Sequence, residues 1–193
     1  VLFNKNKTEL IQYPKGNTRT NYTIPDSVTI VDDKAFYDCD NLTNVTISDS
    51  VTTIGDGAFS LCNNLTNVTI GDSVTEISDS AFKSCTNLTD VTIGDNVTTI
   101  AYNAFYNCKS LASIIIPDSV TEIGNYAFNA CTKLTDVYYP GTEEQWNQII
   151  IGKNNYPLTN STSHYNYGKF TGVKGDYFYK DDIKQKAYQL VEF

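Results

Sequence analysis

Residues 42–64 of this chain read LTNVTISDSVTTIGDGAFSLCNN, and residues 65–87 read LTNVTIGDSVTEISDSAFKSCTN. The two stretches align over 23 residues without a gap. In each of them an Ala-Phe pair is followed by a cysteine, and a leucine comes three residues after the cysteine. The same pattern occurs five times, and its cysteines are Cys39, Cys62, Cys85, Cys108 and Cys131. A strict period of this length indicates a repeat protein, in which stacked coils form one continuous core.

Within one coil, the apolar residues follow the pattern of two short extended pieces and a turn. Residues 45–47 alternate apolar, polar and apolar, which predicts a strand whose middle side chain points outward. Residues 49–50 form a polar turn, and residues 51–54 return to the core. We expect Asp56 to be an N-cap and residues 58–62 to form a single helical turn. No coil can bury its own apolar side, so stability must come from contacts between neighbouring coils.

The composition excludes several classes of function. The chain of 193 residues carries a formal net charge of -8, and its Lys and Arg residues are scattered, which argues against binding to nucleic acid or to an anionic membrane. No apolar run approaches the roughly 20 residues that span a bilayer. His164 is the only histidine, and no motif of a nucleotide or zinc site is present. We therefore expect no enzyme activity, no cofactor, no metal and no membrane insertion.

Two columns of repeated side chains need an interpretation. The five cysteines share one position of the coil, so we expect five free, buried thiols that act as small hydrophobic side chains. A second column at the strand exit consists of Asp26, Asp49, Asp72, Asp95 and Asp118. Each Asp could accept hydrogen bonds from its own turn, or calcium could sit between coils. We favour the first interpretation, because each turn offers a single carboxylate.

The repeats divide the chain into four predicted parts. Residues 1–23 hold two apolar runs around a polar turn, which predicts a β-hairpin that caps the first coil. Residues 24–140 are the repeats, and residues 141–168 are predicted to form a C-terminal cap. Residues 169–193 contain two strand-like runs, which we interpret as a hairpin at the start of a further, truncated domain. The absence of any methionine is consistent with a segment of a longer protein.

The predicted C-terminal cap begins with a helix. Thr142 opens a capping box, and Trp146, Ile149 and Ile150 are expected to share one face of that helix. The only tryptophan could seal the last coil or stack on a ligand, and we favour the seal because terminal repeats must be capped. Residues 152–168 are predicted to be a loop.

The repeated residues carry a resemblance to a known family. The run LTNVTISDS at 42–50 is similar to a leucine-rich repeat, and the block AFSLC at 58–62 with the 23-residue period resembles the BspA-like class of bacterial surface proteins. The resemblance covers residues 24–140. It implies a right-handed α/β solenoid of five 23-residue coils, with a parallel β-sheet on the concave side and short helical turns on the other. It also implies an extracellular or cell-surface location within a longer secreted protein.

The outward strand positions form the candidate binding surface. One outward column is threonine over three coils and then changes to Ile115 and Tyr138. Clustered exposed apolar groups and tyrosine are features of interaction sites. We predict a ligand-binding patch on the concave face that consists of Asp90, Thr92, Ser113, Ile115, Asp136 and Tyr138. The alternative is that residues 152–168 fold over this patch as part of the cap.

Three functions remain open from the sequence. The first is a non-enzymatic adhesion or protein-binding module, since solenoids present extended binding sheets, and the family resemblance adds an extracellular or host protein as the partner. The second is a structural spacer that presents other domains, which uniform threonine-rich faces would suit. The third is a glycan-binding surface through Tyr138, Tyr139 and Trp146. The change of residue type along the outward columns favours the first function.

Overall fold

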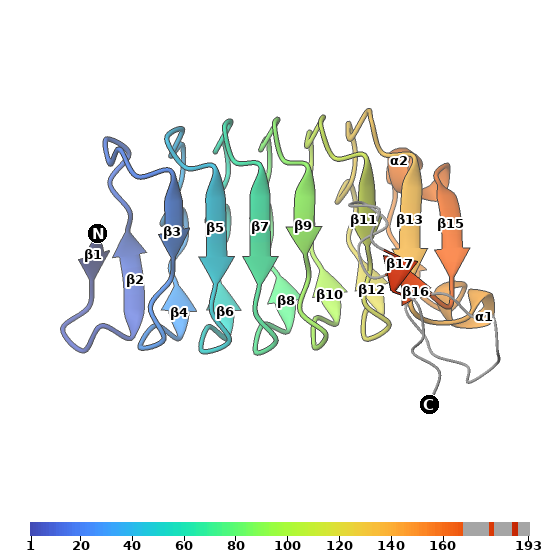
Figure 1. Cartoon of the computed structure of the whole chain (residues 1–193), viewed down its shortest axis with the longest axis horizontal. Coiled ribbons are helices and arrows are strands. Elements are labelled where there is room, and N and C mark those ends of the chain that lie inside the picture. Colours follow the sequence, from blue (N-terminus) through green and yellow to red (C-terminus); the bar gives the residue numbers. More distant parts are fainter. Residues whose placement is uncertain (168–177, 180–186, 189–193) are drawn as a thin grey trace.

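The computed structural model describes residues 1–167, 178–179 and 187–188. The described part winds into about seven stacked turns, which lie in a row between the two ends of the molecule (Figure 1). Parallel strands join the turns, so the predicted leucine-rich solenoid is confirmed, with about seven turns in place of five. Helices are few and short, and among the described residues none is long and apolar enough to cross a membrane.

Each turn contributes one strand to each of two parallel ladders. The main ladder consists of β3 (Asn21–Thr23), β5 (Asn44–Ile47), β7 (Asn67–Ile70), β9 (Asp90–Thr92), β11 (Ser113–Ile115), β13 (Asp136–Tyr139) and β15 (Thr162–Tyr165). The second ladder consists of β2 (Glu9–Gln12), β4 (Ile30–Val31), β6 (Thr53–Ile54), β8 (Glu76–Ile77), β10 (Thr99–Ile100), β12 (Glu122–Ile123) and β14 (Ile150–Ile151). At the N-terminal end, β1 (Leu2–Phe3) pairs antiparallel with β2 and forms the predicted hairpin.

The 23-residue period is also the pairing register of the main ladder. Val45 lies opposite Val68, and Val68 lies opposite Val91, so equivalent side chains of successive coils stack in columns. The burial pattern of β5 and β7 confirms the predicted alternation, because the valine and isoleucine side chains are buried and the threonine between them is exposed. Inside the array, five phenylalanine rings from Phe36 to Phe128 stack with centroids 4.6–5.3 Å apart.

The side opposite the main ladder is built from turns and not from the expected helical turns. The amide of Phe59 donates to the carbonyl oxygen of Ala81 in the next coil at 2.8 Å. Gly57 and Leu61 have φ angles of 61° and 63°, which lie outside the α-helical region. The amides of this segment therefore alternate: that of Phe59 binds the next coil, and that of Ser60 binds the carbonyl oxygen of Gly57 in its own coil at 3.0 Å. An α-helix would instead bond four residues back throughout.

Asp56 is not the N-cap that the sequence suggested. Its own amide donates to the Oδ1 atom of Asp33, one coil earlier, at 2.8 Å. An N-cap side chain would instead accept an amide two or three residues later in its own coil. The prediction is wrong because the turn that follows has no helical amides to cap.

Each ladder is interrupted once in the described structure, between β9 and β11 and between β6 and β8. Both interruptions fall where a glycine is followed, at the same corner of the next coil, by a larger residue: Gly94 by Pro117 and Gly55 by Ser78. A Cβ atom on Gly94 would lie 2.5 Å from the carbonyl oxygen of Gly71, so a glycine coil approaches its neighbour closely. Each ladder thus opens where a coil with a side chain at this corner follows a glycine coil.

Aromatic pairs close both ends of the core. At the N-terminal end Tyr13 stacks on Phe36 at 5.0 Å, and Tyr22 meets the ring of Tyr13 edge-on at 4.9 Å. At the C-terminal end Trp146 meets Tyr139 edge-on at 5.3 Å and is 8% exposed, which confirms that the tryptophan seals the last repeat. Large rings at the two ends cover the apolar column that each terminal coil would otherwise expose to water.

The chain after the fifth repeat forms one more turn in place of the expected helix and loop. α1 (Glu143–Trp146) begins with the predicted capping box at Thr142 but has only four residues. Ile150 does not share its buried face, because it lies in β14 and is 69% exposed. Residues 152–168 were expected to be a loop, yet they contain α2 (Tyr156–Thr159) and β15. β14 and β15 extend the ladders by pairing with β12 and β13.

The hairpin predicted over residues 169–193 lies largely outside the described residues. Its described part is β16 (Phe178–Tyr179), which pairs antiparallel with β17 (Ala187–Tyr188).

Candidate functional site

The six residues of the predicted patch lie on three neighbouring strands of the main ladder, β9, β11 and β13 (Figure 1). Ser113 lies opposite Asp136, and Ile115 lies opposite Tyr138, so the structure brings these four side chains together. All four are half-buried on the outer side of the sheet, while the residues between them are buried. Asp90 and Thr92 are on β9, beyond the interruption of the ladder.

Two residues that sequence reasoning missed complete this surface. β15 lies beside β13 and places His164 opposite Tyr138, with the two rings stacked at a centroid distance of 4.5 Å. The ring of Tyr167 lies 4.7 Å from that of Tyr138. We refer to Ile115, Tyr138, His164 and Tyr167 as the aromatic patch. The predicted alternative, in which residues 152–168 fold over this patch as part of the cap, is therefore correct in part, because His164 and Tyr167 of this segment pack on Tyr138.

A carboxylate holds the histidine of the aromatic patch in place. The Oδ1 atom of Asp136 lies 2.9 Å from Nε2 of His164, and its Oδ2 atom accepts the hydroxyl of Thr135 at 2.7 Å. The hydrogen bond from His164 lowers the pKa of Asp136, and the bond from Thr135 lowers it further. The carboxylate of Asp136 thus fixes the histidine ring against Tyr138.

The other end of the same sheet face is uniform. Exposed Thr46, Thr69 and Thr92 repeat in one column, and Asn44, Asn67 and Asp90 repeat in the next. The side-chain amide of Asn67 lies 2.5 Å from that of Asn44 and 2.9 Å from a carboxylate oxygen of Asp90. The outer polar groups in this column bind one another, so they hold the coils in register.

A groove with a volume of about 830 Å³ runs along the exits of these strands. Its lining includes the threonine column and four residues of the predicted aspartate column, Asp26, Asp49, Asp72 and Asp95. Sequence reasoning found both columns but not the groove between them, because that depends on the shape of the turns.

The aspartate side chains bind backbone amides, but not those of their own turns. Asp49 Oδ1 accepts the amide of Asp72 at 3.1 Å, and Asp72 Oδ1 accepts the amide of Asp95 at 3.0 Å. The carboxylates of Asp49 and Asp72 thus reach the next coil, which corrects the expectation of a bond within one turn for these two residues. The physical reason is that stacked turns bring an amide of the next coil over the carboxylate. Among the described residues, no three acidic, histidine or cysteine side chains form a group that could hold a metal ion.

The glycan surface expected from Tyr138, Tyr139 and Trp146 is not formed. Tyr139 is 2% exposed and Trp146 is 8% exposed, so neither ring can stack on a ligand. Tyr139 points inward because it alternates with Tyr138 along β13. The five cysteines are free and buried, as predicted.

The chain matches the model of the BspA type leucine rich repeat region in six copies over residues 14–135. Because the match covers more than half of the sequence, the chain belongs to this family, whose members are commonly surface proteins. No curated protein sequence gives a significant match.

Solved structures give the same result. A leucine rich cell surface protein from Faecalibacterium prausnitzii is 37% identical, with a TM-score of 0.72 over 74% of this chain and 38% of that one. The leucine rich repeat protein of T. pallidum is 28% identical, with a TM-score of 0.64 over 88% of this chain and 84% of that one. A leucine-rich repeat protein from Eubacterium ventriosum is 25% identical, with a TM-score of 0.66 over 90% of this chain and 50% of that one. The chain thus spans less than half the length of the Faecalibacterium protein.

Proposed function

We propose that the chain is a non-enzymatic module of a bacterial cell-surface protein, and that it adheres to an extracellular or host protein through the outer face of its main ladder. The observation that carries the proposal is the aromatic patch. The columns of the sheet are uniform from β5 to β9 and change to Ile115, Tyr138 and His164 at the C-terminal end. A leucine-rich solenoid is a scaffold type of fold, and its extended sheet is its usual binding surface.

The residue type changes at the outward positions of β11 and β13, but it does not change at the inward positions. The inward neighbours Val137 and Ile114 continue the aliphatic column of the earlier coils and are fully buried. Threonine at the outward positions serves the earlier coils equally well. Half-buried Ile115 and Tyr138 therefore present apolar and aromatic surface where the earlier coils carry threonine, and such clusters often mark protein-binding sites. Asp90 and Asp136 border the patch and would supply a polar rim.

A binding comparison tests this proposal. Wild type and the double variant Ile115→Thr, Tyr138→Thr would be measured by biolayer interferometry against immobilised extracellular-matrix proteins. We expect the double variant to bind about tenfold more weakly or worse, because a central tyrosine is often a dominant contact. The matched control is Thr46→Ala, Thr69→Ala, which alters the same column in the uniform part of the sheet. Melting curves of all three proteins would establish that the variants are folded.

The uniform columns support one other function, a spacer that holds other domains away from the cell. Side chains such as Asn44 and Asn67 bind each other along the array and leave few groups for a partner. Unchanged binding by a folded double variant would move the adhesion site away from the aromatic patch. Absence of binding by wild type and variant alike would favour the spacer.

A further inference from the structure

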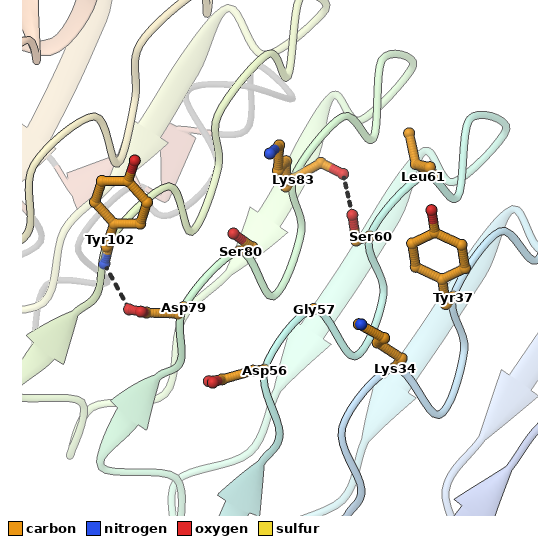
Figure 2. A pocket seen from close by; sticks show the side chains of 10 residues that line it. All are labelled: Lys34, Tyr37, Asp56, Gly57, Ser60, Leu61, Asp79, Ser80, Lys83 and Tyr102. Atoms are coloured by element: carbon orange, nitrogen blue, oxygen red, sulfur yellow. Dashed lines mark hydrogen bonds between the residues drawn. The ribbon is translucent and has the colours of Figure 1, made fainter.

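A second hollow lies outside the main ladder, on the side of the coil that is built from turns. It has a volume of about 450 Å³, a size found among small-ligand pockets. Figure 2 shows that turns of successive coils border it, from Tyr37 at one end to Tyr102 at the other. None of its residues belongs to the adhesion surface proposed above, so the two sites are independent.

The hollow exists because one coil departs from the repeat. Ser60 occupies a position that Tyr37 fills in the preceding coil and Lys83 fills in the following one. Gly57 likewise occupies a position that Lys34 and Ser80 fill. Two small residues thus lie close together in one coil, and Lys34, Tyr37 and Lys83 of the neighbouring coils line the hollow around them (Figure 2).

The backbone conformation at Gly57 does not require a glycine. The equivalent residues Lys34, Ser80 and Asn103 all adopt φ angles of 56–58° at this corner, close to the 61° of Gly57. An added Cβ on Gly57 would meet its nearest neighbour at 3.6 Å, an ordinary contact. The fold therefore tolerates a side chain here, and its absence leaves the hollow open.

The lining offers hydrogen-bond donors and acceptors in balance. Lys34 and Lys83 supply two positive charges, and Asp56 and Asp79 supply two negative charges, so the lining has no net charge. One carboxylate oxygen of Asp79 accepts the amide of Tyr102 at 3.0 Å, which fixes the carboxylate at the rim (Figure 2). Asp56 lies nearer the centre, where burial and the neighbouring carboxylates raise its pKa.

Tyrosine rings stand at both ends of this polar surface. Tyr102 is 46% exposed and packs edge-on against Tyr126 at 5.9 Å, so its orientation is supported from behind. Tyr37 is half-buried, and the ammonium of Lys15 lies 5.0 Å from its ring centre. Supported aromatic faces suit flat apolar surfaces of a ligand, while the charged groups between them suit hydroxyls.

We propose that this hollow binds a neutral oligosaccharide of one to three sugar rings. A sugar presents an apolar face to an aromatic ring and hydroxyls that both donate and accept, which matches two tyrosines around paired lysines and aspartates. A polyanion or polycation would meet as many like charges as opposite ones in this lining. No other coil combines a glycine and a serine at these two positions, so the hollow is particular to this coil.

Titration of the isotope-labelled full chain with a panel of neutral disaccharides and trisaccharides tests the proposal. We expect backbone amide shifts in nuclear magnetic resonance spectra to concentrate at Gly57, Ser60 and Leu61. The variant Ser60→Tyr restores the side chain that Tyr37 provides one coil earlier, and it should weaken binding about tenfold or more by filling the space. The control Tyr156→Ala removes a tyrosine that is 64% exposed at the far end of the chain, and it should bind like wild type.

Three results would overturn the proposal. The first is that no sugar of the panel shifts these amides. The second is that Ser60→Tyr, shown to be folded by its spectrum, binds as wild type does. The third is that short neutral peptides shift the same amides while sugars do not, which would assign the hollow to a peptide.

Discussion

Single side chains in this protein stabilise the coil next to their own. The thiol of Cys85 donates to the carbonyl oxygen of Phe59, one coil earlier, at 3.1 Å, and the hydroxyl of Thr66 donates to the carbonyl oxygen of Thr43 at 2.9 Å. The cysteine is therefore more than the small hydrophobic residue that its column suggests, because it also satisfies a buried acceptor. Asp49 also links two coils, by accepting the amide of Asp72 through its Oδ1 atom.

The phenylalanine column should dominate stability at the residue scale. Phe82 is fully buried, and its ring stacks between those of Phe59 and Phe105 at 5.2 and 5.3 Å. Phe82→Ala is expected to lower the free energy of unfolding by about 3–5 kcal/mol, because it leaves a cavity in the middle of the stack. Urea denaturation followed by circular dichroism measures this. Lys109→Ala, an exposed change in the next coil, is the control, and an equal loss in both variants would contradict the core assignment.

The buried thiols should make the protein sensitive to alkali. Burial raises the pKa of Cys62 from 9.0 to about 12, so the unfolded thiol ionises at a lower pH than the folded one. Stability from this group is complete below pH 9 and is lost as the pH rises from 9 towards 12. We expect the loss of stability between about pH 7.5 and about pH 11 to be smaller in Cys62→Ala than in wild type. Parallel pH profiles of the two urea midpoints would contradict this.

At the scale of the elements, the two terminal coils differ from the inner ones. Each of them has no neighbouring coil on one side to pair with the hydrogen-bonding groups of its backbone. At the C-terminal end Asn155 takes the place of that neighbour. Its Oδ1 atom accepts the amide of Phe128, and its Nδ2 atom donates to the carbonyl oxygens of Gly124 and Gly152, each at 2.9 Å. In the inner coils the equivalent amide, that of Phe105, binds the backbone of the next coil.

Replacement of Asn155 should lower the stability of the protein by more than the loss of a small polar side chain usually does. Asn155 is 2% exposed, so Asn155→Ala leaves the buried amide of Phe128 without its acceptor and removes one donor from the part-buried carbonyl groups of Gly124 and Gly152. We expect the free energy of unfolding to fall by about 2–3 kcal/mol. Thr132→Ala, an exposed change near the same end, is the control for thermal melts. Hydrogen exchange at Phe128 gives a second readout, and unchanged protection there would show that another group caps the coil.

On the scale of the whole molecule, the array behaves as a sum of coils and interfaces, since each coil touches only its neighbours. Val45 pairs with Val68, and Val68 pairs with Val91, so consecutive coils stack in the same register. The coils that carry the aromatic patch, the hollow and the caps depart from the repeat pattern. Function is thus expected where the repeat is broken.

Deletion of one full period tests this additivity. Removal of residues 67–89 joins Thr66 to Asp90, which occupies the same position of the coil as Asn67. We expect the shortened protein to fold, with an unchanged shape of its circular dichroism spectrum and a lower melting temperature, because one interface between coils is lost. Removal of residues 67–78, about half a period, is the control and should abolish cooperative melting. Failure of the full-period deletion to fold would contradict additivity.

Sequence alone determined the solenoid, the inward and outward columns, the buried cysteines and four residues that meet on β11 and β13. These follow from a strict period, since residues 23 positions apart must occupy equivalent places in a stack. The last turn was not predictable in this way. Ile123 pairs with Ile151 and Tyr138 with His164, spacings of 28 and 26 residues that hide the repeat. Only the tertiary structure decided that His164 joins the aromatic patch and that Gly57 opens a hollow, because both depend on which residues of adjacent coils come together.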